Sequence, residues 1–191
     1  MSVLVGLPGS GKSTVGRQLA RRLSLPFVDS DHAIEQRLGC SIREYFEREG
    51  EDRFRDVESE VLDDLSQRAN GVLSTGGGSV LRPVNRERLK ARGQVFYLRS
   101  TPEEVFRRLR HDQNRPLLQV ADPLRRLREL FDIRDPLYRE TSHHVIETGR
   151  PTVAALVNMI LDKLDATGPA PAATTSPPVS SFASDKPHVS S

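Results

Sequence analysis

The sequence is poor in cysteine, tryptophan and aromatic residues in general. Among its 191 residues there is one cysteine, Cys40, and no tryptophan, and aromatic residues make up 5% of the chain. A single cysteine excludes a framework of intrachain disulfides, so we expect a buried, inert thiol in a reducing compartment. The low aromatic content argues against an aromatic-rich β-sandwich.

Long apolar runs and a strong net charge are also missing. No stretch approaches the roughly 18 apolar residues that span a bilayer, and the first residues lack the basic and apolar pattern of a secretion signal. The formal net charge of +2 gives no global attraction to nucleic acid or to an anionic membrane. We therefore expect a cytoplasmic protein that binds neither nucleic acid nor a membrane, and a monomeric state is a further expectation.

The C-terminal stretch differs in composition from the rest of the chain. Residues 166–191 are rich in Ala, Pro, Ser and Thr, and the only acidic or basic residues among them besides His188 are Asp185 and Lys186. Such a stretch cannot bury a core, so we expect a disordered tail. The remaining length suits one compact domain, which we place at residues 1–165.

Short apolar runs alternate with longer segments that have a helical period. The runs are nearly continuous in apolar character, which is typical of strands buried on both faces of a parallel sheet. They cover residues 3–5, 27–28, 72–74, 95–98 and 145–146. Strands that alternate with helices predict βαβ crossovers. The fold class that we expect is α/β, a single doubly wound domain with a central five-stranded parallel sheet flanked by helices.

The stretch from Gly6 to Ser13, GLPGSGKS, matches the phosphate-binding pattern G-x-x-x-x-G-K-[ST]. An apolar strand precedes it and a helical period follows, which is the context that this motif requires. Its glycines let backbone N–H groups surround phosphate oxygens, and the helix N-terminus adds partial positive charge. In such loops the lysine reaches the β- and γ-phosphates and the hydroxyl binds Mg²⁺. The nucleotide-binding residues expected here are Gly9, Ser10, Gly11, Lys12, Ser13 and Thr14.

Two aspartates follow the second expected strand. Asp29 and Asp31 lie at the edge where doubly wound folds bind their ligands. If this segment is extended, both side chains face the same way. They can then hold Mg²⁺ through water and accept a hydrogen bond from a substrate hydroxyl. Alternatively, Asp29 or Ser30 is the N-cap of a helix over residues 33–38, and the two interpretations are compatible.

An arginine and a glycine run are candidates for binding a small anion. Arg55 and Glu58 are three residues apart, so on a helix the carboxylate can orient the guanidinium toward a ligand carboxylate. Taken alone, the pair is more typical of a surface salt bridge. Residues 76–78 are all glycine, which leaves the backbone bare where a small ligand can approach, although a plain turn is the alternative.

A polar stretch between two helical segments is a candidate lid. Residues 110–118 show no periodicity, and we expect a lid at about residues 110–122 that brings Arg115 onto the phosphates. Arg139, which follows Pro136-Leu137-Tyr138, is a further cationic candidate. Taken singly, both arginines would be solvated surface charges.

Together these motifs resemble the shikimate kinase family. The phosphate-binding loop, Asp29-Ser30-Asp31, Phe54-Arg55 with Glu58, the glycine run, Arg115-Pro116-Leu117-Leu118 and Pro136-Leu137-Tyr138-Arg139 occur in the family's order and approximate spacing. The likeness extends from residue 1 to about residue 164. It implies a P-loop kinase that uses ATP and Mg²⁺ to phosphorylate the 3-hydroxyl of shikimate. The products would be shikimate 3-phosphate and ADP, on the pathway to chorismate and the aromatic amino acids.

The resemblance also implies roles for residues on the substrate side. Asp31 would hold the reacting hydroxyl. Arg55 and Arg139 would hold the substrate carboxylate, and Gly77 and Gly78 would contact the substrate through their backbone.

On the nucleotide side, the resemblance implies that Lys12 and Arg115 supply positive charge to the transferring phosphoryl group. Asp29 would assist Mg²⁺ through water, beside Ser13. Arg110 would lie near the adenine, with Arg108 as an alternative, and Arg150 would belong to the loop around the adenine.

Two other classes of function remain open at this point. Another small P-loop kinase, acting on gluconate or a nucleoside monophosphate, would have the same loop but would not need both aspartates together with Arg55 and Arg139. A nucleotide-binding switch or a nucleic-acid-associated ATPase would use the arginines between residues 107 and 128 as a basic strip. Acidic and apolar residues interrupt that strip, and no N-K-x-D motif for guanine is present.

Overall fold

The structure is a computed structural model, and it describes residues 1–68, 70–110 and 120–167. The strands are β1 (Ser2–Val5), β2 (Phe27–Asp29), β3 (Val72–Ser74), β4 (Gln94–Arg99) and β5 (His144–Glu147). The helices are α1 (Lys12–Leu23), α2 (Ser30–Leu38), α3 (Ile42–Glu49), α4 (Glu51–Ser66), α5 (Pro83–Arg92), α6 (Pro102–Leu109), α7 (Pro123–Thr141) and α8 (Val153–Thr167).

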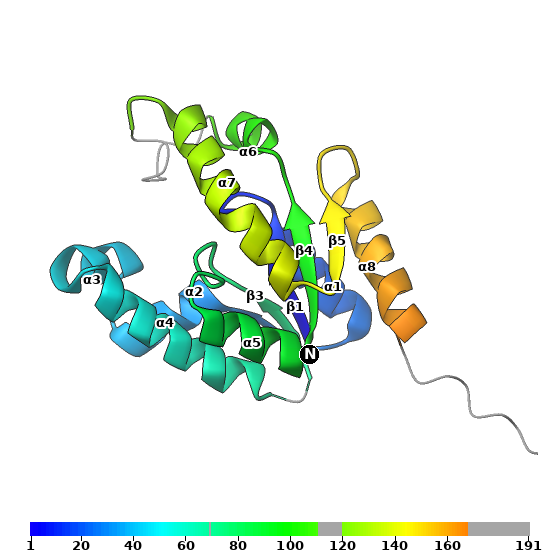
Figure 1. Cartoon of the computed structure of the whole chain (residues 1–191). Helices are drawn as coiled ribbons and strands as arrows, with labels where there is room; N and C mark the ends of the chain where they lie inside the picture. The colour runs from blue at the N-terminus through cyan, green and yellow to red at the C-terminus, as the bar shows by residue number, and fades with distance from the viewer. Residues whose placement is uncertain (69, 111–119, 168–191) are drawn as a thin grey trace, which may run out of the picture.

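The five strands form one parallel sheet in the order β2-β3-β1-β4-β5. Every predicted strand is present, with each end within one residue of its expected position. Because the strands are parallel, each connection crosses over the sheet and carries at least one helix (Figure 1). The expected fold class, a doubly wound α/β domain, is confirmed.

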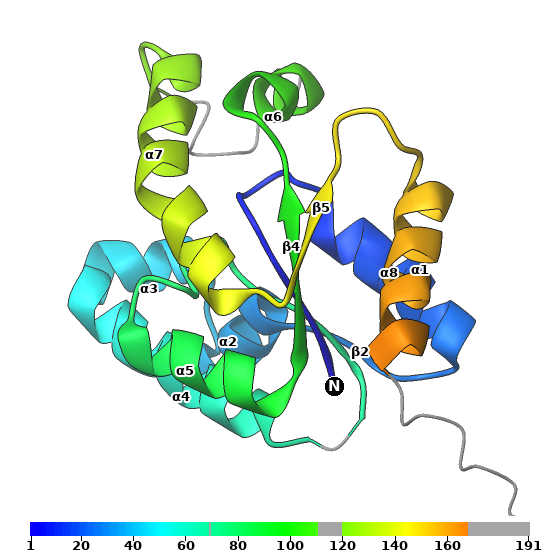
Figure 2. The same ribbon diagram turned by 45° about the vertical axis from the view of Figure 1, so that its right-hand side comes forward.

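Two apolar layers separate the sheet from its helices. Successive strand residues point to opposite faces, so Val3 and Val5 pack in one layer and Leu4 packs in the other. Figure 2 shows α1 and α8 together on one face, with α4 and α5 on the opposite face. The side chains at the centre of both layers are fully buried, which makes the sheet a rigid support for the loops at its edge.

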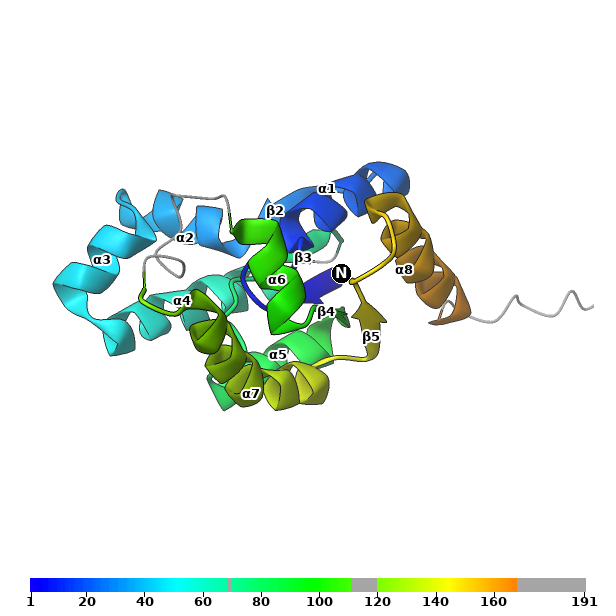
Figure 3. The same ribbon diagram turned by 90° about the horizontal axis from the view of Figure 1, so that it is seen from above.

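The carboxyl ends of the strands carry the loops that matter for function. The phosphate-binding loop follows β1, Asp29 ends β2, and the glycine run follows β3. Helix α6 lies above this edge of the sheet, beside α7 (Figure 3). Helix α6 therefore covers this edge of the sheet, and α7 lies beside α6.

Several details differ from the sequence-based expectations. The helical segment expected after the lid is helix α7, which continues through Pro136, a residue that normally breaks a helix. Helix α8 continues to Thr167, two residues beyond the expected end of the domain. Cys40 is half-buried rather than buried.

Two expected features lie outside the described residues. They are the tail from residue 168 onward and the lid from residue 111 to residue 119, including Arg115. Across the described part of the chain, none of the helices has the length and apolar character needed to span a bilayer.

Candidate active site

A cleft of about 380 Å³ opens at the carboxyl edge of the sheet. Four separate segments line it. The phosphate-binding loop contributes Pro8, Gly9 and residues 11–14, and the junction of β2 and α2 contributes Asp29 and Asp31. The turn after β3 contributes residues 75–77, and α6 contributes Leu109. Motifs that are far apart in the sequence therefore share one cavity, as expected for the switch point of a doubly wound sheet.

The phosphate-binding loop has the backbone that its glycines permit. Gly9 and Gly11 adopt φ values of 82° and 92°, in the left-handed region that favours glycine. A Cβ on Gly9 would lie 2.5 Å from Leu109, so α6 packs directly on the loop. Gly11 is the N-cap of α1, which places the positive end of that helix at the cleft.

Lys12 is buried at the base of this loop. Its side chain donates from Nζ to the carbonyl oxygens of Gly6 and Leu7, at 2.9 and 2.8 Å. The residue is 7% exposed and lines the cleft. A cationic amine is therefore held at the position where phosphate oxygens would bind the loop.

Ser13 and Asp29 form a direct pair. The Ser13 hydroxyl donates to Asp29 Oδ2 at 2.7 Å, and it lies 3.3 Å from Ser74 Oγ. The other oxygen, Asp29 Oδ1, accepts from the backbone N–H of Asp31 at 3.0 Å, so Asp29 is also the N-cap of α2. Both sequence interpretations of Asp29 are compatible with this geometry. A hydroxyl and a carboxylate side by side are the hard oxygen donors that suit Mg²⁺.

Asp31 lies in the first turn of α2 rather than in an extended segment. The Gly76 backbone approaches it so closely that a Cβ on Gly76 would lie 2.5 Å from Asp31 Oδ1. The same turn is tied to α2 by a hydrogen bond from Gly76 N to Ser30 Oγ at 3.0 Å. The first glycine of the run is thus required by the close approach of the carboxylate.

The charge state of Asp31 is set by its surroundings. Burial and, second, the nearby Asp29 carboxylate raise the pKa of Asp31 to about 6, and the Lys12 amine opposes the rise. Protein atoms surround much of the carboxyl group, but its outer edge is exposed in the cleft. A carboxylate with a raised pKa that a substrate can reach is suited to accept a proton near neutral pH.

Arg55 is anchored beside the glycine run. Its Nη1 donates to Glu58 at 2.6 Å, and the Glu58 side chain is 2% exposed. Burial raises the pKa of Glu58, while the Arg55 guanidinium opposes this effect. A Cβ on Gly78 would clash with the Arg55 guanidinium, so these two residues are in direct contact. The pair is therefore a buried ion pair at the glycine run, and the surface salt bridge that the sequence also allowed is excluded.

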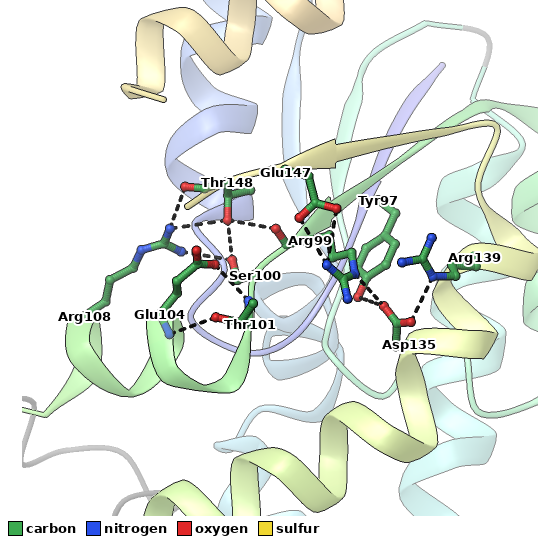
Figure 4. A network of polar contacts seen from close by, with 10 residues as sticks. All are labelled: Tyr97, Arg99, Ser100, Thr101, Glu104, Arg108, Asp135, Arg139, Glu147 and Thr148. Atoms are coloured by element: carbon green, nitrogen blue, oxygen red, sulfur yellow. Dashed lines mark hydrogen bonds and ion pairs between the residues drawn. The ribbon is translucent and has the colours of Figure 1, made fainter. Parts of the chain in front are cut away.

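Arg139 lies apart from this group. Its Nε donates to Asp135 at 2.9 Å, and Asp135 also accepts from Tyr97 and Arg99 (Figure 4). The Arg139 side chain is 48% exposed, and it does not line the cleft. Arg139 is therefore held by Asp135 on α7, whereas Arg55 is held by Glu58 on α4.

A different arginine of α7, Arg134, faces the surroundings of Glu58 and Tyr138. It is close enough to Glu58 and to Tyr138 to influence the pKa of both. Arg134 and Tyr138 are four residues apart and share one face of α7, whereas Arg139 is on another face. Arg134 was not predicted as a site residue. Its spacing of four from Tyr138 would have been a usable signal if residues 134–138 had been assigned to one helix.

The arginines expected near the adenine differ in their surroundings. Arg108 donates from Nη2 to the Thr148 carbonyl at 2.8 Å and from Nη1 to Ser100 Oγ at 3.0 Å, which joins α6 to the loop after β5 (Figure 4). Arg150 is exposed on that loop, and Arg110 is exposed at the C-cap of α6. Neither Arg110 nor Arg150 lines the cleft.

Comparison with known proteins identifies the family. A model of the family described as shikimate kinase matches residues 8–165. The chain belongs to the shikimate kinase family. A shikimate kinase from Paracidovorax citrulli is 63% identical over 169 residues, which cover 86% of this chain and 92% of that protein. A shikimate kinase from Ralstonia nicotianae is 58% identical over 174 residues, covering 91% and 92%.

A solved structure agrees with this family assignment. The shikimate kinase from Acinetobacter baumannii in complex with shikimate has a TM-score of 0.82 and 48% identity, and it covers 86% of this chain and 92% of that one. The resemblance drawn from the motifs is therefore confirmed.

Proposed function

We propose that the protein transfers the γ-phosphoryl group of ATP to the 3-hydroxyl of shikimate, giving shikimate 3-phosphate and ADP. The observation that carries this proposal is the shared cleft. The phosphate-binding loop, Asp31, Gly76 and Gly77 line the same cavity, and Arg55 contacts Gly78, the next residue of the glycine run. A nucleotide phosphate and a small carboxylate that bears hydroxyl groups would meet there.

On the acceptor side, Asp31 is assigned to the reacting hydroxyl and Arg55 to the ring carboxylate. The backbone of Gly77 and Gly78 completes this wall. We assign the second carboxylate-binding arginine to Arg134 instead of Arg139, because Arg134 shares its surroundings with Arg55 and Glu58. Two guanidinium groups would hold a carboxylate through charge-assisted hydrogen bonds.

On the nucleotide side, Gly9, Ser10, Gly11, Lys12, Ser13 and Thr14 are assigned to the phosphates. For the base, Arg108 is favoured over Arg110, because it is fixed against the loop after β5 that carries Arg150. The roles of Arg110 and Arg150 near the adenine, and of Arg115 on the transferring group, stay predictions.

Ser13 and Asp29 fit a magnesium site at the entrance to the loop. The hydroxyl would bind the ion directly and the carboxylate would act through water, as the oxygen donors present suggest. When bound, Mg²⁺ would neutralise charge on the β- and γ-phosphates. Releasing the Ser13 hydroxyl from Asp29 is the local rearrangement that this requires.

The chemistry follows from these positions. The 3-hydroxyl oxygen forms the new bond to Pγ while the bond from Pγ to the bridging oxygen of ADP breaks, and the hydroxyl proton passes to Asp31. Phosphoryl transfer passes through a loose transition state, so the chief requirements are alignment and positive charge. Asp31 aligns the hydroxyl, and Lys12 supplies charge to the phosphates. We further propose that the protein works as a cytoplasmic monomer.

Release of ADP by the purified protein tests the acceptor. Shikimate, gluconate and nucleoside monophosphates are offered in parallel, each with ATP and Mg²⁺. We expect release well above background with shikimate alone. Equal or faster release with gluconate or with a nucleoside monophosphate would contradict the proposed acceptor.

Arg134 and Arg139 of α7 give a matched pair of variants. Arg134→Ala is expected to raise KM for shikimate by about 10- to 150-fold, because a charged hydrogen bond to the carboxylate is worth about 1.5 to 3 kcal/mol. Arg139→Ala removes only an exposed ion pair and is expected to change KM by less than about threefold. Steady-state kinetics at saturating ATP measures both. A larger rise in KM for Arg139→Ala than for Arg134→Ala would instead assign the substrate carboxylate to Arg139.

A further inference from the structure

A buried tyrosine of α7 forms a hydrogen bond with the backbone of the glycine run. The Tyr138 hydroxyl donates to the Gly77 carbonyl oxygen at 2.6 Å. Tyr138 is fully buried, and Gly77 lines the cleft. A side chain that does not line the cleft therefore holds a residue that does.

The same glycine is confined on its other sides. A Cβ on Gly77 would lie 2.6 Å from Pro8 of the phosphate-binding loop, and Gly76 N donates to Ser30 Oγ at 3.0 Å. Gly78 contacts the Arg55 guanidinium. Residues 76–78 thus meet α2, the phosphate-binding loop, α7 and α4, so their backbone is the point where these elements join.

A run of glycines would otherwise allow its peptide planes to rotate, because glycine has few steric restrictions on φ and ψ. In a planar trans peptide the carbonyl of one residue and the N–H of the next point in opposite directions. Fixing the Gly77 carbonyl toward Tyr138 therefore directs the Gly78 N–H away from α7. Within the described part of the chain, the Gly78 N–H donates no hydrogen bond to another protein atom.

We infer that Tyr138 is a positioning residue for the acceptor: its hydroxyl fixes the Gly77–Gly78 peptide so that the Gly78 N–H is directed to the substrate. This inference rests on the proposed function, in which the glycine run faces shikimate.

Arg134 adds a second link at the same hydroxyl. Burial raises the pKa of Tyr138, and the adjacent Arg134 guanidinium opposes that rise. Because the hydroxyl proton is committed to the Gly77 carbonyl, the oxygen lone pairs are available to the guanidinium. Tyr138 therefore joins the backbone contact to one of the proposed carboxylate-binding arginines.

A neighbouring tyrosine provides a matched control. The Tyr97 ring lies 4.9 Å from the Tyr138 ring, and Tyr97 is equally buried. Its hydroxyl also donates a hydrogen bond, at 2.8 Å, but the acceptor is Asp135 (Figure 4). Loss of the Tyr97 hydroxyl would affect packing and stability in the same core without touching the glycine run.

The experiment compares Tyr138→Phe with Tyr97→Phe. Phenylalanine keeps the ring in both variants. Tyr138→Phe removes the hydroxyl donor from the Gly77 carbonyl, and Tyr97→Phe removes one of the donors to Asp135, which still accepts from Arg99 and Arg139. We expect both variants to fold with a lowered melting temperature. Only Tyr138→Phe is expected to raise KM for shikimate, by about 5- to 50-fold, with KM for ATP changed less than about twofold.

Two results would overturn the inference. In one, KM for shikimate is unchanged in Tyr138→Phe. In the other, Tyr97→Phe raises it by the same factor, which would make the effect one of core packing.

A third variant, Arg55→Ala, separates this inference from the proposed function. If Arg55→Ala raises KM for shikimate while Tyr138→Phe does not, only the positioning role is wrong. If Arg55→Ala has no effect either, the assignment of this wall to the acceptor is wrong.

Discussion

Replacement of Lys12 by methionine is expected to lower kcat by at least about 10³-fold while the protein stays folded. Loss of one cation at a transferring phosphoryl group typically costs about 10³- to 10⁵-fold in rate. Lys12 is held at the base of the loop by two backbone carbonyls and lines the cleft, so neighbouring side chains cannot replace its charge. Steady-state ADP release at saturating substrates measures the change.

The control for this variant is Lys163→Met. Lys163 is exposed on α8, which packs against α1, and it does not line the cleft, so its replacement is expected to leave kcat within about twofold. A melting temperature for Lys12→Met close to that of the parent would show that the loss is chemical. Normal turnover by Lys12→Met would contradict the assignment of the phosphates to this loop.

Asp31→Asn has the second largest expected effect, a fall in kcat of about 10²- to 10⁴-fold. This is the usual contribution of a side chain that takes a proton in the transition state. Asparagine keeps the size of the side chain and its place against Gly76, but it cannot accept the hydroxyl proton. A variant with kcat within a few fold of the parent would show that Asp31 has no part in the proton transfer.

The same residue predicts how activity depends on pH. Because the pKa of Asp31 is raised to about 6, the carboxylate is lost as the pH falls through 6, and kcat/KM of the parent should fall with it. With both substrates below saturation, kcat/KM reports the free protein. The acidic limb of this profile should be absent in Asp31→Asn.

As the pH rises from about 4 to about 6, the stability of the folded protein is expected to fall while its activity rises. A carboxyl group with a raised pKa holds its proton more tightly in the folded state than in the unfolded state, where its pKa is 3.8. Ionisation of Asp31 therefore lowers stability as the pH rises from about 4 to about 6. Asp31→Asn removes this penalty, so at pH 7 its melting temperature should equal or exceed that of the parent.

The sheet and the nucleotide loop were predictable from the sequence because their signals are local. Apolar runs predicted all five strands. Burial on both faces, which leaves no polar alternation, holds for β1, β3 and β4, whereas the edge strands β2 and β5 are only partly buried. The loop from Gly6 to Ser13 is recognisable because its chemistry depends on adjacent residues. The convergence of Asp31, Arg55 and the glycine run could be proposed only from the joint order of the motifs, since no local pattern reports which loops meet.

The residues that bind the acceptor were harder to predict from the sequence, because helix α7 contains a proline. Residues 136–139 were interpreted as a short motif that ends in a cationic candidate, Arg139, and no helix bounds were assigned across Pro136. In the structure the helix continues through Pro136, which turns Tyr138 inward to Gly77 and leaves Arg139 on Asp135. Because the helix continues, Arg134 lies one turn before Tyr138 and faces the surroundings of Glu58. This placement follows from the helical period of 3.6 residues, and no single sequence motif indicates it.

A crystal structure of the protein with ADP, Mg²⁺ and shikimate is the most direct test of the claim that donor and acceptor meet in this one cleft. We expect the ADP phosphates in the loop with Lys12, the 3-hydroxyl of shikimate within hydrogen-bond distance of Asp31, and its carboxylate on Arg55. Shikimate bound away from Asp31, or ADP bound away from Lys12, would contradict the claim.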